Sequence, residues 1–298
     1  MTPKTQTFLE RSLSSIILLG LTGGAVAWGE PIGYALLICI FCNITSVEWY
    51  LMLKERKERS SRLLGLLAGL IYPWCIAATA LLTEAGESHK ASYSLSVGYL
   101  VIFILIAFFL ELYQIDYKKR AGVQALSSMG TTILSFVYPV WLFSFALVVL
   151  STPSLIPFLL WLILTTKMCD IWAYVSGVLV GGKLFKRRFS PVVSPKKTWE
   201  GIIGSFIITS AVSALLFSWI CESAPAPFSN PYLFFCVLMP VIFVLSVAGD
   251  LAGSLVKRGL EVKDSGSLLP GIGGLFDLID SPAFTVSAFV VFLIGASL

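Results

Sequence analysis

Nine apolar segments divide this chain, and most of them are long enough to cross a lipid bilayer. A spanning helix needs about 20 apolar residues, because the hydrocarbon core is about 30 Å thick. No water satisfies the backbone there, so its N–H and C=O groups must pair within the segment. Charged residues make up only 13% of the chain, against about a quarter in soluble domains. The sequence therefore predicts an all-α, polytopic integral membrane protein with about nine transmembrane helices.

The expected spans alternate with short polar connections. They are Ser12–Trp28, Ile32–Leu53, Leu63–Leu82, Leu95–Tyr113, Thr131–Leu150, Leu155–Gly182, Gly201–Cys221, Tyr232–Val256 and Pro282–Leu298. This pattern predicts a five-helix region over residues 1–150 and a four-helix region over 151–298. The second region carries the longest polar loops, 183–200 and 257–281, and we expect it to be the catalytic part.

Positive charge is distributed very unevenly between the connections. Of the 21 Lys and Arg residues, 19 lie in the N-terminal tail and in every second loop after it. Cytoplasmic loops carry an excess of Lys and Arg in membrane proteins. The bias predicts a cytoplasmic N-terminus, a C-terminus outside, and both long polar loops on the cytoplasmic side.

The end of the first span also matches the pattern of a signal-peptide cleavage site. Ala25, Val26 and Ala27 form an A-x-A pattern, which can end a cleaved signal peptide. Small residues are also common at ordinary helix ends, and we expect a retained helix. Cleavage at this point would leave the rest of the topology unchanged.

Ionisable residues inside the spans are costly and are usually functional. Glu48 and Glu111 lie near cytoplasmic span ends, where snorkelling to the interface is the alternative to a functional role for both. Lys167 and Asp170 lie deeper and are three residues apart, so they share a helix face and can pair. A structural ion pair is the alternative to a functional role for these two.

Three further carboxylates are expected at one depth on the cytoplasmic side. Asp250 lies near the end of the eighth span, and Asp277 and Asp280 are three apart before the ninth. Such carboxylates repel one another unless a cation lies between them, and Mg²⁺ prefers carboxylate oxygens. We therefore expect a Mg²⁺ site at these residues, with solvated loop carboxylates as the alternative.

Glycine and lysine residues near these carboxylates favour phosphate binding. Gly271, Gly273 and Gly274 precede a candidate helix start, where backbone can approach a phosphate closely. The segment Ser194–Thr198 offers hydroxyls and two ammonium groups directly before another helix. Ordinary turn glycines and a loop that only sets orientation are the alternatives. Together these features predict phosphoryl or nucleotidyl transfer at the membrane, with a lipid as one substrate.

Metal or redox chemistry through Cys and His is not expected. Cys39 and Cys42 form a C-x-x-C inside an apolar span, where small buried side chains are the better interpretation. The single histidine, His89, lies in a polar loop without a neighbouring cysteine. Zinc catalysis is therefore disfavoured.

The stretch from Ser254 to Asp280 resembles the signature of the CDP-diacylglycerol synthases, the phosphatidate cytidylyltransferases. The segment Ser194–Gly201 and the stretch from Asp170 to Tyr174 are also similar to that family. The resemblance covers roughly the C-terminal half of the chain. The matching signature positions are Ser254, Lys257, Arg258, Lys263, Asp264, Pro270, Gly271, Gly273, Gly274, Asp277 and Asp280.

The resemblance implies synthesis of CDP-diacylglycerol and pyrophosphate from CTP and phosphatidate, with Mg²⁺ as cofactor. Catalytic roles are expected for Asp250, Asp277, Lys257 and Lys263, and metal binding for Asp250, Asp277 and Asp280. The expected substrate-binding residues are Asp170, Ser194, Lys196, Lys197, Thr198, Ser254, Arg258, Asp264, Gly271, Gly273 and Gly274. A bacterial inner membrane is the expected location, with the site facing the cytoplasm. The bilayer is a further partner, a homodimer is one option for assembly, and no nucleic acid is expected.

Two positions depart from the family signature. Ile272 stands at the usual histidine and Leu278 at the usual arginine. Phosphatidate is already an anion at neutral pH, so its attack on CTP needs no strong general base. The sequence thus favours a variant member of the family over an inactive paralogue.

Two other functions remain open at this point. One is a polytopic transporter in which Lys167, Asp170 and Asp250 relay ions. No inverted repeat is visible, and the charges gather at one face instead of the midplane. The other is a different CTP-dependent lipid enzyme, such as a polyprenol kinase, which would share much of the site.

Overall fold

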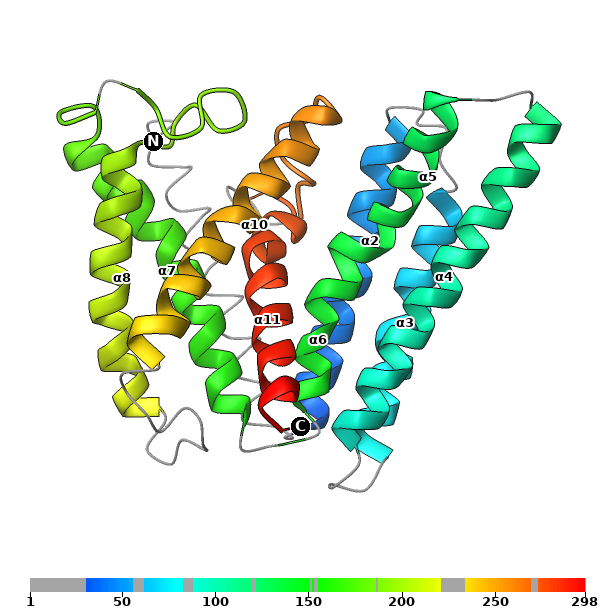
Figure 1. Ribbon diagram of the computed structural model, residues 1–298, viewed down its shortest axis with the longest axis horizontal. Coiled ribbons are helices and arrows are strands. Elements are labelled where there is room, and N and C mark those ends of the chain that lie inside the picture. The colour runs from blue at the N-terminus through cyan, green and yellow to red at the C-terminus, as the bar shows by residue number, and fades with distance from the viewer. Residues whose placement is uncertain are drawn as a thin grey trace. The chain divides into compact units, whose positions relative to one another are not determined.

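The computed structural model describes residues 31–55, 62–82, 88–118, 122–150, 152, 155–185, 187–220, 234–268 and 273–297. These parts of the chain are predominantly helical and contain no strand, only an isolated bridge between Ser190 and Ser194. Among them are eight helices long and apolar enough to cross a membrane (Figure 1). The prediction of an all-α, multi-pass membrane protein is confirmed. The first expected span, Ser12–Trp28, lies outside the described residues.

The chain forms two compact units. The first contains Met1–Pro153 and Val262–Ile279, and the second contains Ser154–Glu261 and Asp280–Leu298. The polar segment Val262–Ile279, which the predicted division at residue 150 assigns to the C-terminal region, therefore packs in the first unit.

The first unit is a bundle of helices that are adjacent in sequence. Its helices are α2 (Ile32–Glu55), α3 (Arg62–Leu82), α4 (Ser88–Lys118), α5 (Val123–Phe136), the π-helical turn η1 (Val137–Trp141) and α6 (Leu142–Val149). Helix α3 packs against α2, α4, α5 and α6 (Figure 1). Most of the buried surface is apolar, so helix packing in this unit rests on shape complementarity, with a few polar ties.

Tyr72 of α3 makes the clearest of these ties. Its ring is buried against Phe136, and its hydroxyl lies 2.7 Å from Ser96 Oγ and accepts a hydrogen bond from Ser144 at 3.0 Å. A buried tyrosine hydroxyl needs such partners, because an unpaired polar group in lipid is costly. One side chain therefore joins α3, α4 and α6.

The π-helical turn η1 contains Pro139. Proline has no N–H to donate, and turns of this kind often form where the regular helical ladder is interrupted. Thr45 of α2 donates its hydroxyl proton to the Pro139 carbonyl at 3.1 Å. The irregular backbone is thus partly satisfied from a neighbouring helix.

In the second unit α7 and α8 lie side by side and form the most extensive helix pair in the described residues (Figure 1). Its helices are α7 (Ile156–Val180), α8 (Trp199–Ile220), the π-helical turn η3 (Phe234–Leu238), α10 (Met239–Gly259) and most of α11 (Phe276–Ser297). A Cβ added at Gly201 of α8 would lie 2.7 Å from the Ala173 carbonyl oxygen and 3.2 Å from the Gly177 Cα of α7. Glycine therefore permits this close approach of the two helices.

Several expected span boundaries were wrong by a turn or more. Helix α11 begins at Phe276 and α4 extends from Ser88 to Lys118, whereas the apolar pattern placed their ends at Pro282, Leu95 and Tyr113. Acidic residues suit the first turn of a helix, because its N-terminus carries positive potential. Hydropathy locates only the part of a helix that is in lipid. The helix itself continues for as long as its backbone groups form intrahelical hydrogen bonds, so its ends lie beyond the apolar segment.

Candidate active site

A pocket of about 310 Å³ opens in the second unit, at the polar ends of α7 and α10. Its walls come from α7, α10 and the loop before α8. Lys197 of the loop forms an ion pair with Asp250 of α10, and both side chains are mostly buried. The lining residues are Asp170, Ala173, Tyr174, Gly177, Val178, Lys196, Lys197 and Asp250. The pocket therefore combines two ammonium groups with two carboxylates.

A second charge cluster in the same unit centres on Lys167. Its ammonium lies 3.3 Å from Asp170 and 3.7 Å from Asp280. Ser281 donates its hydroxyl proton to Asp170 at 3.3 Å, and its backbone N–H to Asp280 at 2.7 Å. The expected pairing of Lys167 with Asp170 is confirmed, and Asp280 joins it. Asp170, which also lines the pocket, connects the two clusters.

Two capping interactions fix the loop that carries Lys196 and Lys197. Thr198 is buried and accepts the Gly201 N–H at 3.0 Å, as an N-cap of α8 does. Glu200 accepts the backbone N–H groups of Leu184 and Phe185, both at 2.9 Å. The loop is thereby closed onto the helix start that it precedes.

Turn hydrogen bonds shape the same loop internally. Ser194 donates its N–H to the Ser190 carbonyl at 3.0 Å, and Phe189 donates to the Lys197 carbonyl at 3.0 Å. The Phe189 ring packs edge-on against Trp199, with centroids 4.8 Å apart. This compact turn places the lysines at the pocket wall. The expected role of Ser194 in substrate binding stays a prediction.

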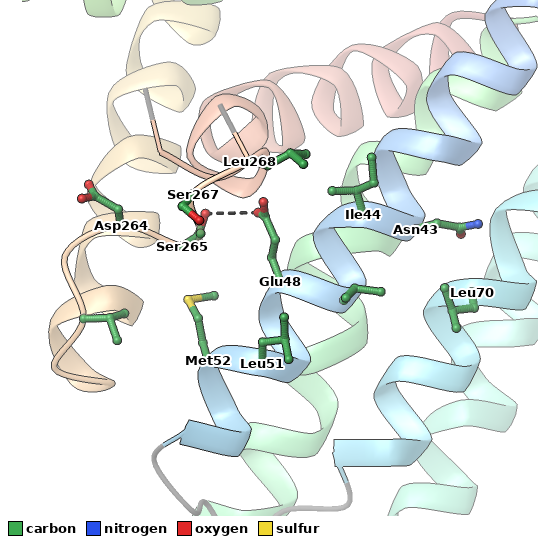
Figure 2. Close-up of a pocket in the computed structure, with 13 residues that line it drawn as sticks. Asn43, Ile44, Glu48, Leu51, Met52, Leu70, Asp264, Ser265, Ser267 and Leu268 are labelled. Carbon is green, nitrogen blue, oxygen red and sulfur yellow. Dashed lines mark hydrogen bonds between the residues drawn. The ribbon is translucent and has the colours of Figure 1, made fainter. Parts of the chain in front are cut away.

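In the first unit, Glu48 of α2 meets the loop before α11. Its carboxylate accepts the N–H of Leu275 at 2.8 Å and of Phe276 at 2.9 Å. It also accepts the hydroxyl proton of Ser265 at 3.2 Å (Figure 2). The side chain is only 7% exposed. Snorkelling to the interface, the alternative for Glu48, is therefore wrong: the local N–H donors satisfy its charge within the protein.

Asp277 is held by the same loop. Its Oδ2 accepts hydrogen bonds from Ser265 N, Ser265 Oγ and Gly274 N at 2.9, 3.0 and 3.0 Å. Gly273 has φ +119°, and a Cβ there would lie 2.7 Å from this oxygen. Glycine therefore allows the backbone at this position to approach the Asp277 carboxylate closely. Phosphate contact by Gly273 and Gly274 stays a prediction.

A larger pocket, of about 630 Å³, lies beside this loop (Figure 2). Ile44, Leu51, Met52 and Leu70 give it an apolar wall, and residues 264–268 with Glu48 give it a polar one. Asp264, expected at the substrate, lines its edge and is exposed.

The remaining predicted residues lie around the end of α10 and the loop after it. Ser254 and Lys257 are half-buried on α10, whereas Arg258 and Lys263 are exposed. Gly271, Pro270 and Ile272 lie outside the described residues. Leu278, at the usual arginine, is half-buried in α11.

The carboxylates suit a hard cation in chemistry, since Mg²⁺ takes oxygen ligands. In the second unit the charges of Asp170, Asp250 and Asp280 are near enough to interact. Asp277 belongs to the first unit. No group of three or more His, Cys, Asp or Glu side chains has metal-ligand spacing in the described ranges, and Lys167 and Lys197 pair with the carboxylates there. The Mg²⁺ site therefore stays a proposal, and it rests on the preference of Mg²⁺ for carboxylate oxygens.

Sequence reasoning missed Ser265 and assigned Glu48 and Glu200 no part in the site. Glu48 was visible as a carboxylate inside an apolar span, which is an expensive placement. Ser265 carries no signal of its own beyond its place in the polar loop. Its partners, Glu48 and Asp277, are 217 and 12 residues away in sequence.

Comparison with known proteins decides the family. A model described as the cytidylyltransferase family matches residues 9–295. The chain belongs to the cytidylyltransferase family. The resemblance seen in the C-terminal motif is thereby confirmed, and it extends over the N-terminal spans as well.

Individual relatives agree with this family. A phosphatidate cytidylyltransferase of Haemophilus influenzae is 41% identical over 123 residues, which is 41% of this chain and 42% of that protein. One of Bacillus subtilis is 39% identical over 126 residues, 42% of this chain and 44% of that protein. These two alignments thus span less than half of each relative. One of Brucella abortus is 29% identical over 296 residues, 97% of this chain and 93% of that protein.

Proposed function

We propose that this family member transfers the cytidylyl group of CTP to phosphatidate, releasing pyrophosphate and leaving CDP-diacylglycerol in the membrane. The observation that carries the proposal is the pocket at Lys196, Lys197, Asp170 and Asp250. It offers paired ammonium groups for phosphate oxygens at the end of two membrane-spanning helices. The names of the relatives support the same reaction.

The reaction needs positioning more than acid–base chemistry. An anionic phosphate oxygen of phosphatidate attacks the α-phosphorus of CTP, an O–P bond forms, and the bond to the β-phosphate oxygen breaks in line. Lys196 and Lys197 would hold phosphate oxygens, with Asp250 orienting Lys197. Lys257, Arg258 and Lys263 would hold further phosphate oxygens. Asp264 would orient Lys263 or Arg258.

We propose Mg²⁺ as the cofactor, and the candidate ligands are Asp250 and Asp280 of the second unit and Asp277 of the first. When bound, the cation neutralises charge on the triphosphate and on the leaving pyrophosphate. The proposed location is a bacterial inner membrane with the site facing the cytoplasm, in agreement with the distribution of Lys and Arg.

The test uses purified protein and two forms of labelled CTP. Cytidylyl transfer moves label from the α-phosphate into chloroform-extractable lipid and leaves γ-label in pyrophosphate. A lipid kinase would move γ-label into lipid. We expect α-label in lipid with phosphatidate as acceptor, and none with a polyprenol or without acceptor. Transfer of γ-label, or equal labelling with a polyprenol, would overturn the proposal.

A pair of lysine variants tests the pocket itself. Lys197→Met removes the ammonium that pairs with Asp250, and we expect activity to fall at least about 100-fold, as for loss of charge-assisted contacts to a phosphate. Lys183→Met is the matched control, because Lys183 lies in the same loop, donates to the Leu179 carbonyl and does not line the pocket. Equal activity of the two variants would remove the pocket from the mechanism.

A further inference from the structure

Glu48 reaches the start of α11 from a helix more than 200 residues earlier in sequence. Its two carboxylate oxygens accept the N–H groups of Leu275 and Phe276 at 2.8 and 2.9 Å. The first N–H groups of a helix have no partner within the helix. Hydrogen bonds from them to a carboxylate are charge-assisted and favoured by the helix dipole. Glu48 therefore fixes the backbone at the first turn of α11.

Asp277 projects from this turn and completes the same set of bonds. It accepts the Gly274 N–H, so the N–H groups of residues 274, 275 and 276 are divided between two carboxylates. Any shift of Glu48 changes the backbone to which Asp277 is attached.

Ser265 joins the two carboxylates directly. Its Oγ lies 3.2 Å from Glu48 Oε2 and 3.0 Å from Asp277 Oδ2. A hydroxyl has one proton, so it donates to one carboxylate at a time. The space around these groups is tight, because a Cβ at Gly266 would lie 3.0 Å from Glu48 Oε1. The position and charge of Glu48 thus act on Asp277 through the backbone and through Ser265.

We infer that Glu48 is a positioning residue for Asp277: it sets the first turn of α11 and, through Ser265, the orientation of the Asp277 carboxylate toward the cation that accompanies CTP. This inference rests on the proposed function. A purely structural carboxylate would instead lower the amount of folded protein, without changing how the folded protein responds to the cation.

The first unit offers a matched control for this distinction. Glu111 of α4 is also buried, with 4% exposure, and accepts a hydrogen bond from Ser128 Oγ at 3.0 Å. No hydrogen bond links it to the loop before α11 among the described residues. Glu111→Gln therefore removes a buried charge of the same kind at a different place.

The first experiment measures the Mg²⁺ concentration for half-maximal cytidylyl transfer. We expect Glu48→Gln to raise this concentration about tenfold, which corresponds to the free energy of one charge-assisted hydrogen bond. At saturating Mg²⁺ the rate should recover to most of the wild-type value. Ser265→Ala keeps both helix-start bonds of Glu48, and we expect a smaller rise in the same direction. Glu111→Gln should leave the half-maximal concentration unchanged. Equal Mg²⁺ responses of Glu48→Gln, Ser265→Ala and the wild type would overturn the inference.

The second experiment needs no substrate and separates this inference from the proposed function. Hydrogen–deuterium exchange of the full chain in detergent should speed up at residues 274–277 in Glu48→Gln, and not in Glu111→Gln. Unchanged exchange there would overturn the inference even for an active enzyme. If exchange is faster in Glu48→Gln but the wild type transfers no cytidylyl group, the contact of Glu48 with the start of α11 is supported and the proposed function is rejected. If Glu48→Gln does not fold, the Mg²⁺ response of Ser265→Ala decides: an unchanged half-maximal concentration would overturn the inference.

Discussion

Two mostly buried lysines of the second unit have carboxylate partners. Lys167 contacts Asp170 and Asp280, and Lys197 contacts Asp250. Removing one partner of a buried pair leaves a charge with no compensation, which costs more than removing both. The stability of the second unit therefore depends on the balance of these charges.

This balance makes a specific prediction for Lys167. Lys167→Met should lower the free energy of unfolding by about 3 kcal/mol, because Asp170 and Asp280 then repel each other without a cation between them. The double variant Lys167→Met with Asp280→Asn should regain much of the loss. Thermal unfolding in detergent measures both. A double variant less stable than the sum of its single changes would contradict this explanation.

Helices of both units pack through small residues and through aromatic rings. Gly201 and Gly177 bring α7 and α8 close together, whereas Tyr72 and Phe136 fill the space between α3 and α5. Without a hydrophobic driving force between helices in lipid, such shape complementarity carries much of the association. The loop with Lys196 and Lys197 is anchored on the α7–α8 pair.

A Cβ added at the α7–α8 contact should destabilise the protein. We expect Gly201→Ala to cost about 1–3 kcal/mol of stability, because the added Cβ meets backbone that cannot move aside cheaply. The control is Gly98→Ala in α4, where an added Cβ would meet nothing within 4 Å. That change should be neutral or stabilising, by up to about 1 kcal/mol. Equal melting temperatures for the two variants would show that α7 and α8 do not pack as described.

At the scale of the molecule, the distribution of charge predicts one orientation for every loop. Lys54 and Arg187 belong to loops of the Lys- and Arg-rich set, and Thr152 lies in a loop of the other set. The two sets should therefore face opposite sides of the membrane.

Cysteine labelling tests this topology. In a variant without native cysteines, we expect Thr152→Cys to react with a membrane-impermeant maleimide added outside intact cells. Lys54→Cys and Arg187→Cys should react only after the membrane is opened. Outside labelling at position 187 would place the candidate pocket on the wrong side for cytosolic CTP.

The sequence by itself determined the membrane class, the eight spans among the described residues, the family, and the pairing of Lys167 with Asp170. The family follows from the resemblance of the C-terminal motif, and the others follow from hydropathy, charge and short spacings, which act over a few helical turns. Only the tertiary structure decided the partners of Glu48, the contacts of Ser265 and the addition of Asp280 to the Lys167 cluster. The physical reason is that satisfying a buried carboxylate requires donors in three dimensions, and those of Glu48 lie more than 200 residues away along the chain.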